Sequence, residues 1–275
     1  MDAFSDPSVE RVVVMSSAQV GKTSVLENVI GFFIDYDPSP IMVVEPTIEV
    51  GKSFSKDRLA PMLRDTPCLT RKVADVKSRD SGNTVNHKVF YGGHITIAGA
   101  NSAASLRGRS IRIALADDID AFPSSAGTEG DPVSLIGKRT TTFWNRKIGL
   151  FSTPTDEGLS KIEAEYLKSD RRKYYVPCVH CGEFQIFTFD NVKWPKSEPS
   201  KAQYECPFCK GAITDNDKAR MILRGEWRKE KPEVKVIYES EELTAWWQTL
   251  GEEWKSVFRK QVTLDKDPTR EQLHE

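Results

Sequence analysis

Two pairs of cysteines have the spacing of a metal site. Cys178 and Cys181 form one C-x-x-C pair, Cys206 and Cys209 form another, and 24 residues separate the pairs. Four thiolates at this spacing close a tetrahedral Zn²⁺ site with no open position for water, so we predict a structural zinc ribbon without zinc catalysis. His180, between two of the ligands, is predicted not to bind the metal. The alternative is a redox dithiol, but that needs one pair beside a βαβ unit rather than two matched pairs.

The segment MSSAQVGKTS, residues 15–24, nearly matches the phosphate-loop pattern G-x-x-x-x-G-K-[ST]. In such a loop, backbone N–H groups at a helix N-terminus bind phosphate oxygens, a lysine reaches the β- and γ-phosphates, and a hydroxyl holds Mg²⁺. A small serine replaces the first glycine and can adopt a suitable turn. A chance G-K-T on a solvated helix end is the alternative. We predict that ATP and Mg²⁺ bind here, with the lysine also catalytic, through Ser16, Ser17, Gln19, Gly21, Lys22, Thr23 and Ser24.

An acidic motif follows an apolar run in IRIALADDID, residues 111–120. A phosphate loop that hydrolyses ATP needs an aspartate after a buried strand to hold Mg²⁺, and a second acid that activates water. We predict that Asp117 and Thr23 hold the metal and that Asp118 is the catalytic base. Asp118 is one methylene shorter than the commoner glutamate, which puts the full hydrolytic rate in question, and Asp120 is an alternative base. An acidic helix cap is the other interpretation of this cluster.

A third motif, LFSTPT at residues 150–155, ends a predicted strand in small hydroxyl side chains. We predict that Ser152 and Thr153 sense the γ-phosphate or the hydrolytic water and pass the change to a downstream element. An ordinary S-T-P turn is the alternative interpretation.

These motifs need a framework that brings the ends of separate strands together. Residues 9–15 are β-branched and apolar, which favours a buried strand. The apolar stripe of an amphipathic helix follows at Leu26, Val29, Ile30 and Phe33. The alternation of strands and helices continues through residues 41–44, 89–100 (a strand or a hairpin), 111–118, 132–143, 147–155 and 158–169. Such alternation predicts the α/β fold class, with a parallel sheet and helices on both faces.

Composition and sequence pattern predict how the chain is divided into domains. The 275 residues include 39 Lys and Arg against 40 Asp and Glu, so net charge offers no global argument for nucleic acid. The apolar runs are too short for a bilayer and we find no signal-peptide pattern, so we expect an intracellular protein with no membrane partner. We predict a nucleotide-binding domain over 1–170, a cysteine module over 171–228 and a helical, polar tail over 229–275.

A basic segment lies where the first two predicted domains meet. KSDRRKYYV, residues 168–176, combines Arg171, Arg172 and Lys173 with two tyrosines. Such a segment can follow a DNA backbone, because cations contact phosphates and aromatic rings stack. A solvated face that joins two domains is an equally good interpretation.

The chain resembles the large terminase subunit of tailed bacteriophages, of the lambda-like GpA family, through an ordered set of segments: SSAQVGKT, VVEPT, LRGRSIRIALADDIDAFP, EGDPVSL, LFSTPT and the paired cysteines. The resemblance covers nearly all of residues 1–228. It implies a RecA-like (ASCE) P-loop NTPase followed by a zinc ribbon. It also implies an ATPase motor that drives double-stranded DNA into a procapsid in the host cell cytoplasm, as a ring homo-oligomer with a small terminase subunit and a portal protein.

The chain also departs from this family pattern. Ala18 lies where many large terminases have an arginine, so we expect Arg107 or Arg109 to neutralise transition-state charge, in the same subunit or across the ring. Surface contacts are the alternative role for these arginines. Relatives carry a C-terminal nuclease domain, so we expect this chain to be a fragment truncated before it, with motor chemistry but no DNA cutting. A prophage relic that binds nucleotide or nucleic acid without effective hydrolysis is the alternative function.

Overall fold

The computed structural model describes residues 1–73 and 83–230 of the chain. Contacts divide the chain into two compact units, Met1–Ser169 and Asp170–Glu275, and each is described by itself. The prediction of a helical tail falls outside the described residues, except for residues 229 and 230. Within the described part, every helix is too short or too polar to cross a bilayer.

The first unit is built on a six-stranded sheet with the order β1-β6-β5-β2-β4-β3. All neighbouring strands in it are parallel except β3 and β4, which form an antiparallel hairpin at one edge. The strands are β1 (Arg11–Met15), β2 (Ile41–Glu45), β3 (His87–Phe90), β4 (Gly93–Gly99), β5 (Ile113–Ala116) and β6 (Lys147–Ser152). The predicted α/β class with a largely parallel sheet is confirmed.

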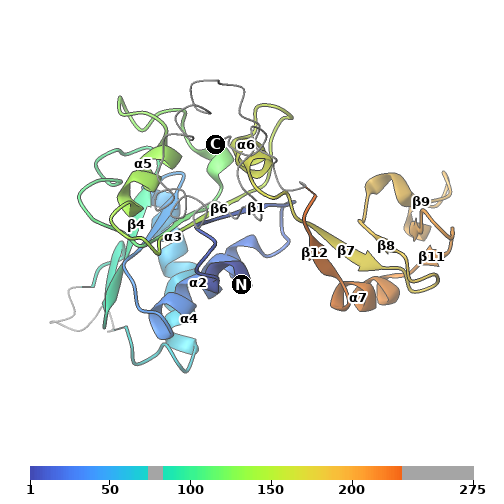
Figure 1. Ribbon diagram of the computed structural model, residues 1–275, viewed down its shortest axis with the longest axis horizontal. Helices are drawn as coiled ribbons and strands as arrows, with labels where there is room; N and C mark the ends of the chain where they lie inside the picture. The colour runs from blue at the N-terminus through green and yellow to red at the C-terminus, as the bar shows by residue number, and fades with distance from the viewer. Residues whose placement is uncertain (74–82, 231–275) are drawn as a thin grey trace, which may run out of the picture. The chain divides into compact units, whose positions relative to one another are not determined.

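Helices cover both faces of this sheet (Figure 1). One apolar cluster joins α2, α3 and α4 to one face, and a second cluster joins α5 and α6 to the other. The helical elements are α1 (Asp2–Ser5), α2 (Lys22–Asp35), α3 (Ile48–Phe54), the π-helical η1 (Ser55–Leu59), α4 (Ala60–Asp65), the 3-10 turn η2 (Ile119–Ala121), α5 (Pro132–Thr140) and α6 (Lys161–Lys168). The short helix α1 was not predicted; its Phe4 stacks on Phe151 of β6, with ring centroids 6.2 Å apart.

Helix α2 forms where the apolar stripe predicted it. The four stripe residues are at most 1% exposed, because they pack against the sheet. Gly21 caps the N-terminus with φ 90°, a left-handed conformation that glycine adopts without steric cost. The chain therefore turns sharply from β1 into α2 and leaves the loop between them at the carboxyl edge of the sheet.

The second unit has small sheets and a small core. One sheet has the order β12-β7-β8 and the other has the order β11-β10-β9. Its elements are β7 (Lys173–Pro177), β8 (Phe184–Gln185), η3 (Phe189–Asn191), β9 (Val192–Lys193), η4 (Pro199–Lys201), β10 (Gln203–Glu205), β11 (Ala212–Ile213), α7 (Asp215–Leu223) and β12 (Glu226–Arg228). The buried core residues are Val176, Cys178, Cys206, Ile213 and Met221. A core of this size gives little stability without a cross-link or a metal.

Candidate functional site

The phosphate-loop candidate lies between β1 and α2. Ser16 continues the sheet, since its N–H donates to the carbonyl of Ser152 at 3.3 Å. Gln19 then has φ 60° and Gly21 has φ 90°, so two of three consecutive loop residues have a left-handed backbone conformation. The Nζ of Lys22 donates to the carbonyl of Ser17 at 3.1 Å, across the loop. The remaining loop residue that we predicted, Ser24, is exposed in the first turn of α2.

The structure brings the loop lysine to the third motif. Strand β6 pairs with β1, with Met15 opposite Ser152, so the residues after both strands lie side by side. Lys22 Nζ donates to Thr153 Oγ1 at 2.7 Å. Ser152 is 2% exposed, and its Oγ accepts a hydrogen bond from the N–H of Asp120 at 3.2 Å. The hydroxyl motif therefore contacts both the phosphate loop and the acidic loop after β5.

The acidic motif also lies beside the phosphate loop. Thr23 Oγ1 is 3.3 Å from Asp117 Oδ2, and Asp117 is only 6% exposed. Burial, followed by the charge of Asp118, raises the pKa of Asp117. A hydroxyl and a carboxylate are the hard oxygen ligands that Mg²⁺ prefers, and a divalent cation would offset the buried negative charge. The two side chains therefore fit the metal role that we predicted for them.

The next acids along the chain differ in what they contact. Asp118 is exposed and has φ 50°, a left-handed conformation that is uncommon outside glycine. Asp120 instead accepts hydrogen bonds from Thr155 N at 2.9 Å, Thr155 Oγ1 at 3.0 Å and Ile162 N at 2.7 Å. Burial raises the pKa of Asp120, but hydrogen bonds from Ser160, Ile162 and Thr155 outweigh it, so the pKa is lowered. Both oxygens of Asp120 thus hold the loop after β6 and the start of α6, which speaks against Asp120 as the base.

Glu45 is the site residue that we did not predict. It ends β2, is 4% exposed, and has a pKa raised to about 8 by burial and then by the charges of Asp117 and Asp118. An acid that directly follows four apolar strand residues was the available signal. Without the strand order, nothing linked it to the acids of β5.

Arg107 and Arg109 both have partners within the chain. Arg107 forms an ion pair with Glu129. The Nη1 of Arg109 is 3.3 Å from Nδ1 of His87 on β3. Among the described residues, Arg107 and Arg109 contact Glu129 and His87 and not Lys22 or Asp117.

Residues 1–227 match the family described as "Phage terminase large subunit gpA, ATPase domain". The chain belongs to this family. Among curated proteins, it is 28% identical over 215 residues to the terminase large subunit of Enterobacteria phage P21, and 29% identical over 215 residues to that of Escherichia phage lambda. Each match covers 75% of this chain and 33% of the relative, so the chain spans about a third of the length of these relatives.

Among solved structures, the chain is similar to the ATPase domain of the large terminase of Thermus phage P74-26. That match has a TM-score of 0.42 and 18% sequence identity, and it covers 57% of this chain and 64% of the other. A mutant of the same domain matches with a TM-score of 0.41 and 15% identity.

The terminase chain has a second site, formed by its four cysteines. Their Sγ atoms all lie within 4.8 Å of one another, and the Cys178–Cys209 and Cys181–Cys206 pairs are each 3.9 Å apart. Tetrahedral Zn²⁺ with Zn–S distances near 2.3 Å requires sulfurs about 3.8 Å apart, so the four thiolates fit this ion. His180 contacts a backbone carbonyl, with its Nε2 2.8 Å from Ala212 O, and its predicted absence from the ligand set stays a prediction.

Local backbone turns shape both cysteine knuckles. Gly182 and Lys210, each just past the second cysteine of a pair, have φ 78° and 60°. In the second knuckle the left-handed residue is thus a lysine and not the following glycine. Gly211 has another role, because a Cβ built on it would lie 2.6 Å from the ring of His180.

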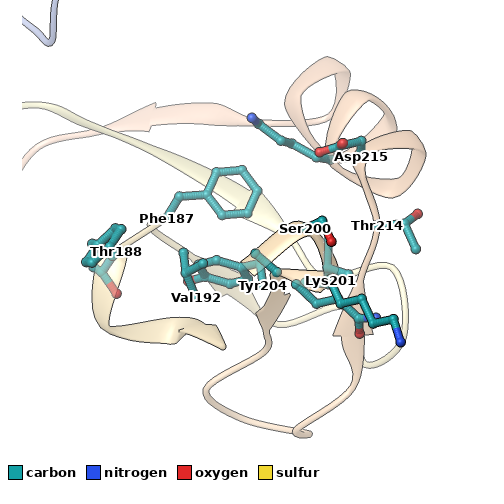
Figure 2. Close-up of a pocket in the computed structure, with 13 residues that line it drawn as sticks. Phe187, Thr188, Val192, Ser200, Lys201, Tyr204, Thr214 and Asp215 are labelled. Atoms are coloured by element: carbon teal, nitrogen blue, oxygen red, sulfur yellow. The ribbon is translucent and has the colours of Figure 1, made fainter. Parts of the chain in front are cut away.

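A hollow of about 770 Å³ lies in the cysteine unit (Figure 2). Phe187 and Tyr204 form one side of it, with ring centroids 4.9 Å apart in an edge-to-face contact, and Asp215 and Thr214 lie across from them. It contains one carboxylate and no phosphate loop. None of the residues that we predicted to bind nucleotide lines this hollow.

The basic segment beside the cysteines is engaged within the chain. Arg172 pairs with Asp170 at 2.7 Å, and Lys173 pairs with Glu230 at 2.7 Å. Since opposite charges already neutralise two of its cations, this segment fits a solvated face better than a DNA-backbone contact.

Proposed function

We propose that this chain hydrolyses ATP with Mg²⁺ and uses the energy to drive double-stranded DNA into a procapsid. The single observation that carries the proposal is the convergence of Lys22, Thr23, Asp117 and Thr153, which follow three adjacent strands of the sheet. Phosphoryl transfer depends mainly on positioning and on neutralising charge, and this set supplies a cation, two oxygen ligands for a metal and a hydroxyl beside the lysine.

Each of these residues has a role in this proposal. Lys22 binds the β- and γ-phosphates, while Thr23 and Asp117 hold Mg²⁺, which neutralises phosphate charge when bound. Asp118 is the base that activates the attacking water. Thr153 now accepts a hydrogen bond from Lys22. When nucleotide binds, the γ-phosphate replaces this hydrogen bond, and Thr153 contacts the γ-phosphate. Ser16, Ser17, Gln19, Gly21 and Ser24 supply the rest of the loop that surrounds the phosphates.

The coupling between hydrolysis and movement would start at Ser152 and Thr153. Ser152 bonds to the backbone of Asp120, and the carboxylate of Asp120 bonds to Thr155 and to the first turn of α6. A movement of the residues that contact the γ-phosphate would thus be transmitted to α6 through this series of hydrogen bonds.

Finer features of the fold support the same proposal. Strand β6 lies between β1, which leads into the loop, and β5, which leads into Asp117. This order is what the resemblance to RecA-like ASCE ATPases implies. We further propose that the four cysteines hold a structural Zn²⁺ and make the second unit a zinc ribbon.

Assembly partners are part of the proposal because the relatives are terminase large subunits. We propose a ring homo-oligomer in the host cell cytoplasm that works with a small terminase subunit and a portal protein. In such a ring, Arg107 or Arg109 would leave its partner, Glu129 or His87, to neutralise charge at a neighbouring subunit's nucleotide.

ATP hydrolysis by the purified chain, with and without double-stranded DNA, tests the motor chemistry. We expect hydrolysis that DNA stimulates, and a loss of about 10²-fold or more in Lys22→Ala, because the lysine neutralises phosphate charge in the transition state. A wild-type rate equal to that of Lys22→Ala would contradict the proposal. It would favour instead the relic that binds nucleotide without effective hydrolysis.

A further inference from the structure

Glu45 is a buried carboxylate that the roles above leave unused. It is 4% exposed at the end of β2, and no side chain among the described residues donates a hydrogen bond to it. Acids are rarely buried in this way, because an unpaired carboxylate loses its hydration without compensation. A buried acid at the end of a strand lowers the stability of the fold. Its presence there indicates a functional constraint rather than a role in packing.

The sheet register places Glu45 beside the metal ligand. Val44 of β2 pairs with Ala116 of β5, so Glu45 and Asp117 come next on their two parallel strands. Side chains alternate along a strand, and the preceding pair of that same face, Val43 and Leu115, packs in the cluster that contains α2. Both carboxylates therefore project toward the side where α2 begins with the phosphate loop.

Strand order places Glu45 on the side from which water attacks. Counted from the phosphate loop after β1, the sheet continues with β6, β5 and β2. Lys22 reaches Thr153 after β6, and Thr23 reaches Asp117 after β5, so phosphates held by the loop extend in this direction. In-line displacement requires that water approach the γ-phosphorus opposite the leaving ADP. In this strand order, the carboxylate at the end of β2 is the next one beyond Asp117 in the direction away from the phosphate loop.

Helix α3 holds Glu45 in place. Thr47 caps α3 by accepting a hydrogen bond from Val50 N at 3.3 Å, and only two residues separate the end of the strand from the start of the helix. Gly51 then lets the helix approach closely: a Cβ built there would lie 3.7 Å from Cγ of Glu45 and 2.6 Å from a methyl of Ile97. A side chain restricted in this way is oriented before substrate binds.

The two other acids cannot fill this position equally well. Asp117 is committed to Thr23 and the metal, while Asp118 is exposed and one methylene shorter than glutamate. The carboxylates of Glu45, Asp117 and Asp118 do not lie close enough together to bind one ion. Among the described residues, only the four cysteines form a group of three or more ligand atoms with that geometry. This spread fits a water-orienting acid beside the metal better than an additional metal ligand.

We propose that Glu45 is a catalytic carboxylate of the nucleotide site that orients the attacking water and, together with Asp118, accepts its proton. This inference rests on the ATPase function proposed above. The water oxygen bonds to the γ-phosphorus, and the bond from that phosphorus to the β–γ bridging oxygen breaks. ADP leaves with the electron pair of that bond, and the proton from water passes through the carboxylate to the released phosphate.

The test compares Glu45→Gln with the wild-type full chain in three measurements: melting temperature, affinity for Mg²⁺ and a fluorescent ATP analogue, and hydrolysis rate. We expect Glu45→Gln to bind the analogue within about threefold of wild type and to hydrolyse ATP about 10²-fold more slowly, as for loss of a general base. Its affinity for Mg²⁺·ADP·aluminium fluoride, which resembles the transition state, should fall as well. The exposed Glu49→Gln, in the first turn of α3, is the matched control and should change none of these.

Further variants separate the possible outcomes. Because Glu45 and Asp118 act on one water, we expect the double variant Glu45→Gln/Asp118→Asn to be about as slow as Glu45→Gln alone. Hydrolysis by Glu45→Gln within threefold of wild type would overturn the catalytic role while Lys22→Ala still supports the ATPase. A parallel loss of melting temperature and nucleotide affinity would show a structural role and also overturn it. A wild-type chain no faster than Lys22→Ala would overturn both proposals.

Discussion

The proposed nucleotide site draws its side chains from the ends of four strands and the loops after them, whereas the proposed zinc site draws all its ligands from two short knuckles. Thr23 and Asp117 lie 94 positions apart and meet only because β6 and β5 lie next to each other beside β1. Within a knuckle, two cysteines lie three positions apart, and one left-handed residue after them shapes the turn.

This difference governs what supports each site. The cysteine unit has a small core that includes two of the four cysteines, Cys178 and Cys206, so a metal held by the cysteines would couple the folding of this unit to metal binding. The first unit has two apolar clusters on the faces of its sheet, and its site residues lie at the edge of that core. Changes at the nucleotide site should therefore alter chemistry more than folding, and changes at the cysteines should do the reverse.

The largest expected effect is loss of the metal. Structural Zn²⁺ contributes about 10–16 kcal/mol in zinc-finger peptides, as much as the whole stability of a small domain. We expect Cys206→Ser to lose zinc and to make the second unit sensitive to protease, while residues 1–169 stay resistant. Metal analysis by mass spectrometry and limited proteolysis measure this. Cys68→Ser, at an exposed thiol outside the cluster, is the control. Equal zinc content in both variants would contradict the role of Cys206 as a zinc ligand.

A smaller structural effect but a large chemical one is expected at Thr23. Its hydroxyl lies 3.3 Å from Asp117, so Thr23→Ala removes a predicted metal ligand and Thr23→Ser keeps it. We expect the alanine variant to need a higher Mg²⁺ concentration and to hydrolyse ATP about 10-fold or more slowly, with its melting temperature unchanged. Titration of the ATPase rate with Mg²⁺ checks this. Equal Mg²⁺ dependence in the two variants would contradict the metal role.

Asp120 should affect folding although it lies at the edge of the sheet where we propose that nucleotide binds. Its carboxylate joins the loop after β6 to the start of α6 by hydrogen bonds. Asp120→Asn weakens hydrogen bonds to Thr155 and Ile162, and we expect a loss of about 1–3 kcal/mol in the free energy of unfolding. Its pKa is lowered in the folded state, so its contribution is present above the unfolded value of about 3.9 and disappears as pH falls through the folded value.

Urea denaturation across pH 2 to 7 measures the Asp120 effect. The wild type should lose stability relative to Asp120→Asn on the acid side of that range, and the difference should be constant near neutrality. A wild-type advantage that shrinks as the pH rises from 2 toward 7 would have the wrong sign for a depressed carboxylate pKa.

The smallest expected effect is at the start of α7. Thr214 and Asp217 form a capping box, in which Thr214 Oγ1 accepts from Asp217 N and the Asp217 carboxylate accepts from Thr214. Thr214→Ala should cost about 1 kcal/mol without loss of zinc, whereas Thr214→Ser should cost less. Thermal unfolding with metal analysis tests this; loss of zinc in the alanine variant would mean that the metal site depends on α7 more than on its knuckles.

Much of the fold was predictable because it rests on local patterns. The helical period of the apolar residues predicts α2, and the short apolar runs predict the buried strands. The glycine before Lys22 indicates the backbone conformation of the turn, and each of these signals lies within a short stretch of sequence. The hairpin of β3 and β4 was predicted only as a strand or a hairpin, and α1 was missed because a four-residue helix has no recognisable period. The left-handed Lys210 was also missed, since a lysine gives no sign that it adopts φ 60°.

By itself, the sequence determined where the phosphate loop, the acidic motif, the hydroxyl motif and the cysteine pairs lie, because each depends on neighbours within a few residues. The tertiary structure alone decided that Glu45 lies beside Asp117, that Asp120 binds α6, and that Arg107 pairs with Glu129. These contacts depend on strand order and register, which arise from the packing of the whole sheet against its helices. No local pattern encodes which strand becomes the neighbour of another.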